Sequence, residues 1–319
     1  MGIRTWVSIA GFSLWLTACA DASAQPIRLP MGYIPNVQYA PFYLADAEGY
    51  FEDAGMEIEF DYSLETDAVA RVGAGEAPFG LASGEQVLLA RAQGIPVVYV
   101  LAWFQDFPVA VASPSGSGID GPQDLPGTRI GIPGLFGASY IGYQALLRAA
   151  GLPEDTATLE AIGFNQVEAL LAGQIDGVVV YANNEPIQLE ARGMPVDLIR
   201  VADYVELASN GLITNEETLA SDPELVGRMV RAVVLGLEAT MRDPEAAFTV
   251  AARYVPGLSE SGEDVQRRVL QASLTFWQAE RIGFSSPESW ANMEAVLLAM
   301  GLLPGPVEVE RAYTNEFVP

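Results

Sequence analysis

Uncharged polar and aromatic side chains gather where an expected strand gives way to a helix. The stretch 29–51 begins in an apolar strand at 27–31, breaks at Gly32 and Pro35, and resumes as a helix that ends at Gly49. In an open α/β sheet, such a loop lies at the carboxyl end of a strand, where ligands bind. We therefore expect this loop to hold a neutral, flat molecule with polar edges and to perform no chemistry on it. Its candidate ligand-binding residues are Tyr33, Asn36, Gln38 and Tyr39.

Five further loops that follow expected strands repeat this chemistry. Ring faces and amide edges suit a planar heterocycle, and convergent polar groups in a cleft orient a ligand. None of the 16 basic residues, all of them Arg, falls in these loops. A sulfonate, nitrate or phosphate would normally require a guanidinium group, so such anions are disfavoured. The further candidates are Ser83, Glu85, Trp103, Phe104, Phe136, Ser139, Tyr140, Asn165, Tyr181, Asn183, Asn184 and Glu185.

Three of these loops leave other interpretations open. The glycines of 134–140 precede a helix and could cradle a phosphate, although the Lys and Ser/Thr of a phosphate-binding loop are absent. Glu85 and Glu185 are the only carboxylates in the loops and could act as a catalytic pair. We interpret them instead as hydrogen-bond acceptors and expect no catalytic residue.

The residue types that are missing exclude several functions. The chain has no His, no Lys and a single Cys. Zinc or iron sites built from His and Cys, a pyridoxal Schiff base and a His-assisted triad are therefore excluded. An enzyme would have to use a carboxylate pair or a divalent ion bound by oxygen atoms. We expect no metal and no cofactor.

The net charge indicates which partners to expect. The chain of 319 residues carries a formal charge of −25. Nucleic acids are improbable partners because phosphate binding requires a basic surface. The acidity keeps the protein soluble, with adaptation to a salt-rich habitat as a second interpretation.

The amino terminus has the pattern of a secretory signal peptide at 1–18. Arg4 precedes an apolar run at 6–16, which is too short to span a bilayer stably. The tetrad that ends in Cys19 resembles a bacterial lipobox, in which the thiol receives a diacylglycerol; the alternative is an ordinary signal peptide with an incidental Cys. We expect a lipid-anchored linker at 19–26 and a soluble remainder tethered outside the cytoplasmic membrane, on the periplasmic side or at the cell surface.

The rest of the chain alternates strand and helix, which predicts largely parallel sheets with helices on both faces. A Ser/Gly/Pro-rich segment at 113–118 suggests a first crossing between two domains, and a second crossing is expected near Asn210. This places 27–112 and 211–319 in the first lobe and 113–210 in the second. From Asp222 onward the pattern is helical.

Several motifs resemble a known family. The segments 32–36, 40–43 and 49–51 are similar to the opening of the thiamine-pyrimidine-precursor-binding type of substrate-binding protein, which serves ABC importers. The resemblance covers nearly the whole mature chain. It implies a two-lobed type II periplasmic-binding-protein fold with the ligand in the hinge cleft, a monomer, and delivery to a permease and its ATPase.

Within that family, 83–87, 131–140 and 181–186 are most similar to the riboflavin-binding lipoproteins. The isoalloxazine would then stack on Tyr33, Tyr39, Trp103, Phe104 or Tyr140. The ribityl hydroxyls would meet Glu85, Ser139, Asn183 and Glu185. A thiamine pyrimidine precursor is the alternative ligand; an oxygen-ligand hydrolase and a sulfonate or nitrate binder are less favoured. The related eukaryotic pyrimidine synthases need a His and a Lys that this chain lacks.

Overall fold

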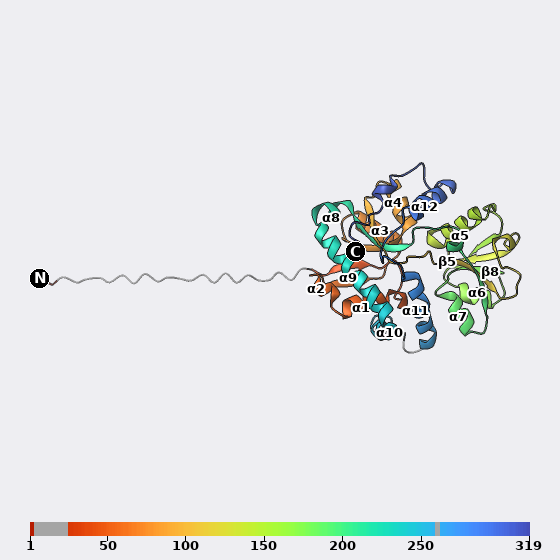
Figure 1. Cartoon of the computed structure of the whole chain (residues 1–319), viewed down its shortest axis with the longest axis horizontal. Helices are drawn as coiled ribbons and strands as arrows, with labels where there is room; N and C mark the ends of the chain where they lie inside the picture. Colours follow the sequence, from red (N-terminus) through yellow and green to blue (C-terminus); the bar gives the residue numbers. More distant parts are fainter. Residues whose placement is uncertain (3–24, 259–261) are drawn as a thin grey trace.

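The computed structural model describes residues 1–2, 25–258 and 262–319, and these form two lobes (Figure 1). The expected signal peptide and Cys19 therefore lie almost wholly outside the described residues. The larger lobe combines the beginning and the end of the described chain, and the smaller lobe holds its middle, with β5, α5, β8, α6 and α7. Among the described residues, no helix combines the length and apolar character needed to cross a bilayer.

The larger lobe contains two small sheets. One consists of β1 (Ile27–Pro30) and β2 (Ile58–Asp61), paired in parallel. The other has the order β3-β10-β4, formed by β3 (Gly80–Ser83), β10 (Asn210–Asn215) and β4 (Val97–Ala102). The central strand β10 runs antiparallel to both neighbours, so β3 and β4 run in the same direction.

The smaller lobe is built on one five-stranded sheet with the order β7-β6-β8-β5-β9. Only β5 runs against its neighbours, so the other strands all point the same way. The strands are β5 (Val109–Pro114), β6 (Arg129–Ile132), β7 (Thr158–Ala161), β8 (Gly177–Tyr181) and β9 (Val196–Arg200). The expected parallel arrangement thus holds except for β5 and β10, the first strand after each crossing.

The first crossing lies earlier than predicted. We expected Val109–Ala112 to extend the first lobe, but β5 pairs with β8 and β9, so the chain has already entered the smaller lobe at Val109. The Ser/Gly/Pro-rich segment instead follows β5 and leads to β6. The second crossing is near the predicted place, because β10 begins at Asn210.

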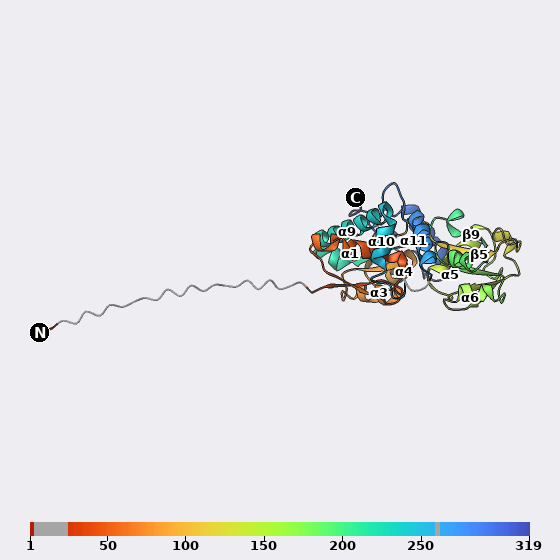
Figure 2. The ribbon, with the colours of Figure 1, turned by 90° about the horizontal axis from the view of Figure 1, so that it is seen from below.

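Helices cover both faces of the larger lobe. Figure 2 shows α9, α1 and α10 on one face and α3 on the other. The helices of the larger lobe are α1 (Ala40–Ala47), α2 (Tyr50–Asp53), α3 (Glu65–Gly73), α4 (Gly84–Ala92), α8 (Glu216–Ser221), α9 (Pro223–Arg242), α10 (Pro244–Ala251), α11 (Glu263–Trp277) and α12 (Pro287–Ala299). Those of the smaller lobe are α5 (Gly137–Ala149), α6 (Gln166–Leu171) and α7 (Glu185–Ala191).

The late helices α9, α10 and α12 begin where the sequence predicts, because each has a capping residue followed by Pro. Asp222, Asp243 and Ser286 accept hydrogen bonds from backbone N–H groups of the first turns of α9, α10 and α12. The short helices α2, α7 and α8 were not predicted, although the Asn215 side chain caps α8 and Pro186 lies in the first turn of α7. One buried apolar cluster joins α4 and α12 to α5 of the smaller lobe, so the lobes share part of their core.

Candidate functional site

The carboxyl ends of strands from both lobes border one cavity of about 220 Å³. Tyr181, at the end of β8, and Asn210, at the start of β10, both line it. Since β10 is antiparallel to β3 and β4, its first residue lies at the edge where those strands end. The cavity therefore occupies the place where the sequence analysis expected the polar loops to converge.

Most of the predicted site residues line this cavity. Asn36 and Asn184 supply amides from opposite lobes, and Ser139 lies in the first turn of α5. Whether these groups contact a ligand stays a prediction. The predicted residues that line it are Tyr33, Asn36, Gln38, Tyr39, Trp103, Phe104, Phe136, Ser139, Tyr181, Asn184 and Glu185.

A cluster of aromatic rings forms the apolar wall. Tyr39 and Trp103 are stacked, with ring centroids 5.1 Å apart and planes inclined by 23°. The ring centroids of Phe104 and Trp103 lie 4.8 Å apart, with the ring planes inclined by 72°. All three rings are buried, so their neighbours in the protein fix their positions. Such a preformed ring surface suits a planar apolar ligand face.

Two exposed rings, Phe136 and Phe164, and the half-buried ring of Tyr33 lie on the lining of the cavity. Tyr33 and Phe164 have their centroids 5.2 Å apart and bridge the two lobes, and Phe136 lies exposed on the same lining. Exposed aromatic side chains at a cavity mouth are unusual for a soluble surface unless they meet another molecule or close on one another.

Glu185, the first residue of α7, brings a carboxyl group to the wall. It accepts hydrogen bonds from the backbone N–H of Tyr181 at 2.9 Å and from the Asn184 amide at 3.2 Å. Burial raises the pKa of Glu185 to about 7, although these hydrogen bonds oppose the shift. At neutral pH this carboxyl therefore exists in both protonation states and can donate as well as accept a hydrogen bond.

Glu65, the first residue of α3, is a second carboxyl group on the wall, and the sequence analysis missed it. Its Oε2 lies 2.9 Å from the hydroxyl of Ser83, which is also 2.5 Å from Glu85 Oε1. Its Oε1 accepts a hydrogen bond from Asn210, whose side-chain oxygen accepts one from Tyr181 OH. Burial and the nearby Glu85 raise the pKa of Glu65 well above its usual range.

The remaining predicted residues do not line the cavity. Ser83 and Glu85 lie buried behind Glu65. Tyr140 packs on the apolar core because α5 begins at Gly137, earlier than predicted. Asn165 is exposed and donates to the carbonyl of Ile162.

Asn183 likewise faces the protein and not the cavity. It is fully buried, and its amide donates to Gln38 Oε1 and Ser273 Oγ, both at 2.8 Å. Because Asn183 follows β8 while its partners belong to the larger lobe, this amide ties the two lobes together.

Other lining residues were outside the predicted set. Gln86, Phe164 and Gln166 closely follow β3 or β7 in sequence, so the same reasoning could have included them. Glu65, Leu64, Thr66 and Asn210 carry no such signal, since an acid at a helix start is ordinary. Only the packing of α3 and β10 against β3 brings them to the cavity.

The charge of the site is negative. Among the described residues that line the cavity there is no Arg, and Glu65 and Glu185 are its only ionisable acids. The described residues also hold no cluster of three or more His, Cys, Asp or Glu side chains that could bind a metal ion. The arrangement can bind through ring faces and hydrogen bonds, and it offers no cation for an anionic ligand.

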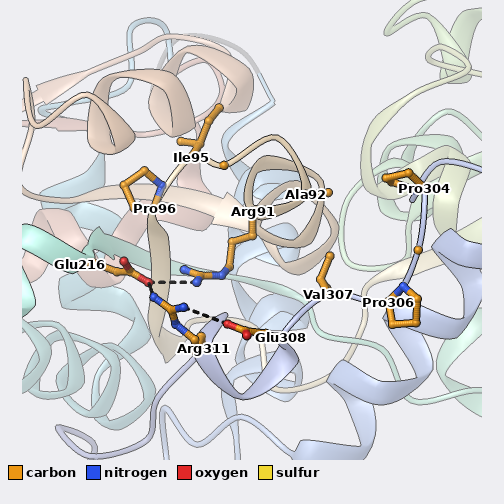
Figure 3. A pocket seen from close by; sticks show the side chains of 12 residues that line it. Arg91, Ala92, Ile95, Pro96, Glu216, Pro304, Pro306, Val307, Glu308 and Arg311 are labelled. Carbon is orange, nitrogen blue, oxygen red and sulfur yellow. Dashed lines mark hydrogen bonds and ion pairs between the residues drawn. The ribbon is translucent and has the colours of Figure 1, made fainter.

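A larger, more open cavity of about 630 Å³ lies away from these strand ends (Figure 3). It contains Arg91 and Arg311, which both pair with Glu216, and Arg311 also pairs with Glu308. Since these guanidinium groups are already neutralised by carboxylates, we assign no anion site to it.

Residues 36–247 match the model of the NMT1/THI5-like family, which is most of the described chain. This chain belongs to that family. The resemblance found in the sequence motifs is therefore confirmed at the family level.

Sequence matches to two known proteins cover nearly the full chain. The riboflavin-binding protein RibY of Chloroflexus aurantiacus is 40% identical over 315 residues, covering 95% of this chain and 90% of that protein. The formylaminopyrimidine-binding protein of Halalkalibacterium halodurans is 26% identical, covering 94% and 92%.

Solved structures confirm the fold. The periplasmic aliphatic sulphonate binding protein SsuA of Escherichia coli superposes with a TM-score of 0.74 at 15% identity, covering 90% of this chain and 97% of that one. At so low an identity the likeness concerns the fold alone. The family member described here thus has the predicted two-lobed type II periplasmic-binding-protein fold.

Proposed function

We propose that this protein is the extracytoplasmic substrate-binding component of an ABC importer that captures riboflavin in the cavity between its lobes. The observation that carries the proposal is a cavity lined by rings and amides without a cation, in a chain 40% identical to a riboflavin-binding protein. Riboflavin matches this lining because it is uncharged at neutral pH and joins a flat tricyclic ring to a polyol.

The lining suggests how each part of riboflavin is bound. The stacked pair of Tyr39 and Trp103 and the adjacent Phe104 offer an ordered apolar surface for the isoalloxazine. Amides such as Asn36 and Asn184 suit the ring carbonyls and N–H group, since an amide both donates and accepts. Ser139 and Glu185 suit the ribityl hydroxyls.

Titration of riboflavin with the purified protein tests this proposal, because stacking on Trp103 should quench flavin fluorescence. We expect saturable quenching with a nanomolar to micromolar Kd, about 8–12 kcal/mol of binding free energy. A useful negative control is the same titration with SsuA, which has a similar fold and is described as binding aliphatic sulphonates. Absence of quenching at micromolar protein would remove riboflavin as the ligand.

A thiamine pyrimidine precursor is the second candidate, supported by the formylaminopyrimidine-binding relative. Such a ligand is a single ring and would leave part of the aromatic wall uncovered. Competition separates the two candidates: we expect excess pyrimidine to leave flavin quenching unchanged, whereas displacement at low concentration would favour the pyrimidine.

We further infer that the protein binds without catalysing a reaction. The absence of His and Lys supports this, since the related pyrimidine synthases are expected to need both. A hydrolase using Glu85 and Glu185 is disfavoured, because Glu85 is fully buried and does not line the cavity. Incubation with riboflavin followed by mass analysis should return the unchanged vitamin.

Lipid attachment at Cys19 is part of the proposal. It would hold the mature protein, as a monomer, at the outer face of the cytoplasmic membrane beside a permease and its ATPase. Expression in a bacterial host with a labelled fatty acid should label the wild-type protein and leave a Cys19→Ala variant unlabelled. Labelling of the variant would contradict attachment at this thiol.

A further inference from the structure

Two carboxyl groups share one hydroxyl beside the cavity. Ser83 Oγ lies 2.9 Å from Glu65 Oε2 and 2.5 Å from Glu85 Oε1, both hydrogen-bond distances. A serine hydroxyl has one proton and can donate to only one acceptor. The other contact therefore needs a proton on a carboxyl group, so the pair of acids retains one proton.

The hydrogen-bond partners indicate where this proton resides. Glu65 accepts from both Ser83 and Asn210, as an ionised carboxylate does. Within the described part of the chain, Glu85 Oε2 is buried and has no partner. A buried, unpaired oxygen is far less costly on a neutral carboxyl than on a carboxylate. The proton thus belongs to Glu85, which donates to Ser83, which in turn donates to Glu65.

We propose that Glu85, Ser83 and Glu65 form a proton-holding chain that determines ligand specificity. Glu65 offers an acceptor oxygen to an N–H or O–H donor of an uncharged ligand. The proton on Glu85 is retained while the ligand is bound. Glu65 borders the cavity and Glu85 lies behind it, so only the outer member can touch the ligand. The inference deepens the proposed function and rests on it for the ligand used below.

The described residues around Glu85, Ser83 and Glu65 offer no unpaired cation. The hydroxyls of Tyr39 and Tyr181 face it, and their pKa values are raised by burial and by Glu65, so both stay neutral. Glu185 lies on the same cavity wall from α7. Arg71 of α3 and Arg91 of α4 are paired with Asp61 and Glu216. None of these neighbouring residues supplies a positive charge that would offset ionisation of both Glu65 and Glu85.

This arrangement links ligand binding to protonation. A ligand that covers Glu65 removes its remaining water, which makes a doubly ionised pair less favourable and raises its pKa further. The bound form then holds the proton more tightly than the free form, so affinity must fall as pH rises through the range in which the free pair of carboxyl groups loses this proton.

Riboflavin affinity measured from about pH 7 to about pH 9.5 tests the chain, with one unit of pKa shift giving about tenfold weaker binding. In Glu85→Gln, the amide N–H donates to Ser83 and cannot titrate, so we expect this fall to disappear. Ionisation of the flavin ring affects both proteins equally and cancels in the comparison. The exposed Glu76→Gln variant is the matched control and should behave as wild type. A flat wild-type profile, or an equal slope in Glu85→Gln, overturns the inference.

Infrared spectroscopy of the ligand-free protein tests the proton separately from riboflavin. Because Glu185 is itself partly protonated at neutral pH, the comparison is made in a Glu185→Gln background. We expect a protonated-carboxyl C=O band there that disappears when Glu85→Gln is added. Identical carboxyl bands with and without Glu85→Gln would overturn the inference whatever the ligand is. If the band is found as expected but riboflavin does not quench, the proposed ligand fails and the proton-holding chain stands.

Discussion

Tyr39 and Trp103 are separated by more than sixty residues in sequence, yet their rings stack 5.1 Å apart on the wall of the cavity. Tyr39 ends the short helix η1 (Val37–Tyr39) and donates its hydroxyl proton to the carbonyl of Met31 at 2.7 Å. Trp103 follows β4, and its backbone N–H donates to Asn210. Each ring is thus held by the backbone of the larger lobe.

Replacing Trp103 with Leu should weaken riboflavin binding by about tenfold to a hundredfold, since stacking of a base on an aromatic ring contributes about 1–3 kcal/mol. Flavin quenching measures the affinity, and thermal unfolding confirms that the variant is folded. Phe284→Leu, which changes an exposed ring outside the cavity, is the control. Equal affinities for wild type and Trp103→Leu would show that this ring does not meet the flavin.

A phosphate group on the ligand should impair binding. The cavity lining holds Glu65 and Glu185 and no Arg among the described residues, so an added dianion finds repulsion without a counter-charge. We expect riboflavin 5′-phosphate to bind at least about tenfold more weakly than riboflavin, a difference of about 1.4 kcal/mol. Equal quenching titrations for the two flavins would contradict this electrostatic selection.

Stability should decline with rising pH partly because of Glu185. Burial raises its pKa from 4.5 to about 7 in the folded protein, so the folded state binds more protons than the unfolded state between these values. The favourable contribution is complete below pH 4.5 and is lost as pH approaches about 7. We expect Glu185→Gln to lessen the decrease in Tm over this range, with Glu76→Gln unchanged. An undiminished decrease in Glu185→Gln would exclude this carboxyl as a source.

Asn183→Ala should destabilise the protein by about 2 kcal/mol, because it leaves the buried Gln38 Oε1 without its donor. The exposed Asn165→Ala is the matched control and should change stability by less than about 0.5 kcal/mol. Urea unfolding measures both. If Asn183→Ala weakened riboflavin binding without lowering stability, its assignment as a link between the lobes would be wrong.

Replacing each of two glycines of α9 with Ala should change the stability of the protein in opposite directions. A Cβ at Gly236 would lie 2.2 Å from the carbonyl oxygen of Pro41, so Gly236→Ala forces α1 and α9 apart and should lower stability by about 1–3 kcal/mol. A Cβ at Gly227 would meet the flexible end of Arg231 at 3.3 Å and the ring of Phe317 at an ordinary 3.5 Å, so Gly227→Ala should gain up to about 1 kcal/mol of helix propensity. Equal shifts of Tm would contradict this close helix approach.

Local patterns were sufficient for many elements. The apolar run of β8 and the capped start of α9 both lie where the sequence predicts, because each depends on residues within one turn or strand. The boundary of the first crossing was wrong because the residues of β5 are apolar whichever sheet receives them. Their pairing with β8 is a long-range choice that no local pattern encodes.

The residue types alone determined that the site would be aromatic, amide-rich and free of Lys and His, because composition sets which side chains exist to line a cavity. Tertiary structure decided which of them do. Packing of α3 beside β3 brings Glu65 to the cavity and leaves Glu85 behind it. Contact between the smaller lobe and η1 places the Asn183 amide against Gln38 and Ser273. A side chain after a strand can face either the cavity or the protein, and only its long-range neighbours determine the direction.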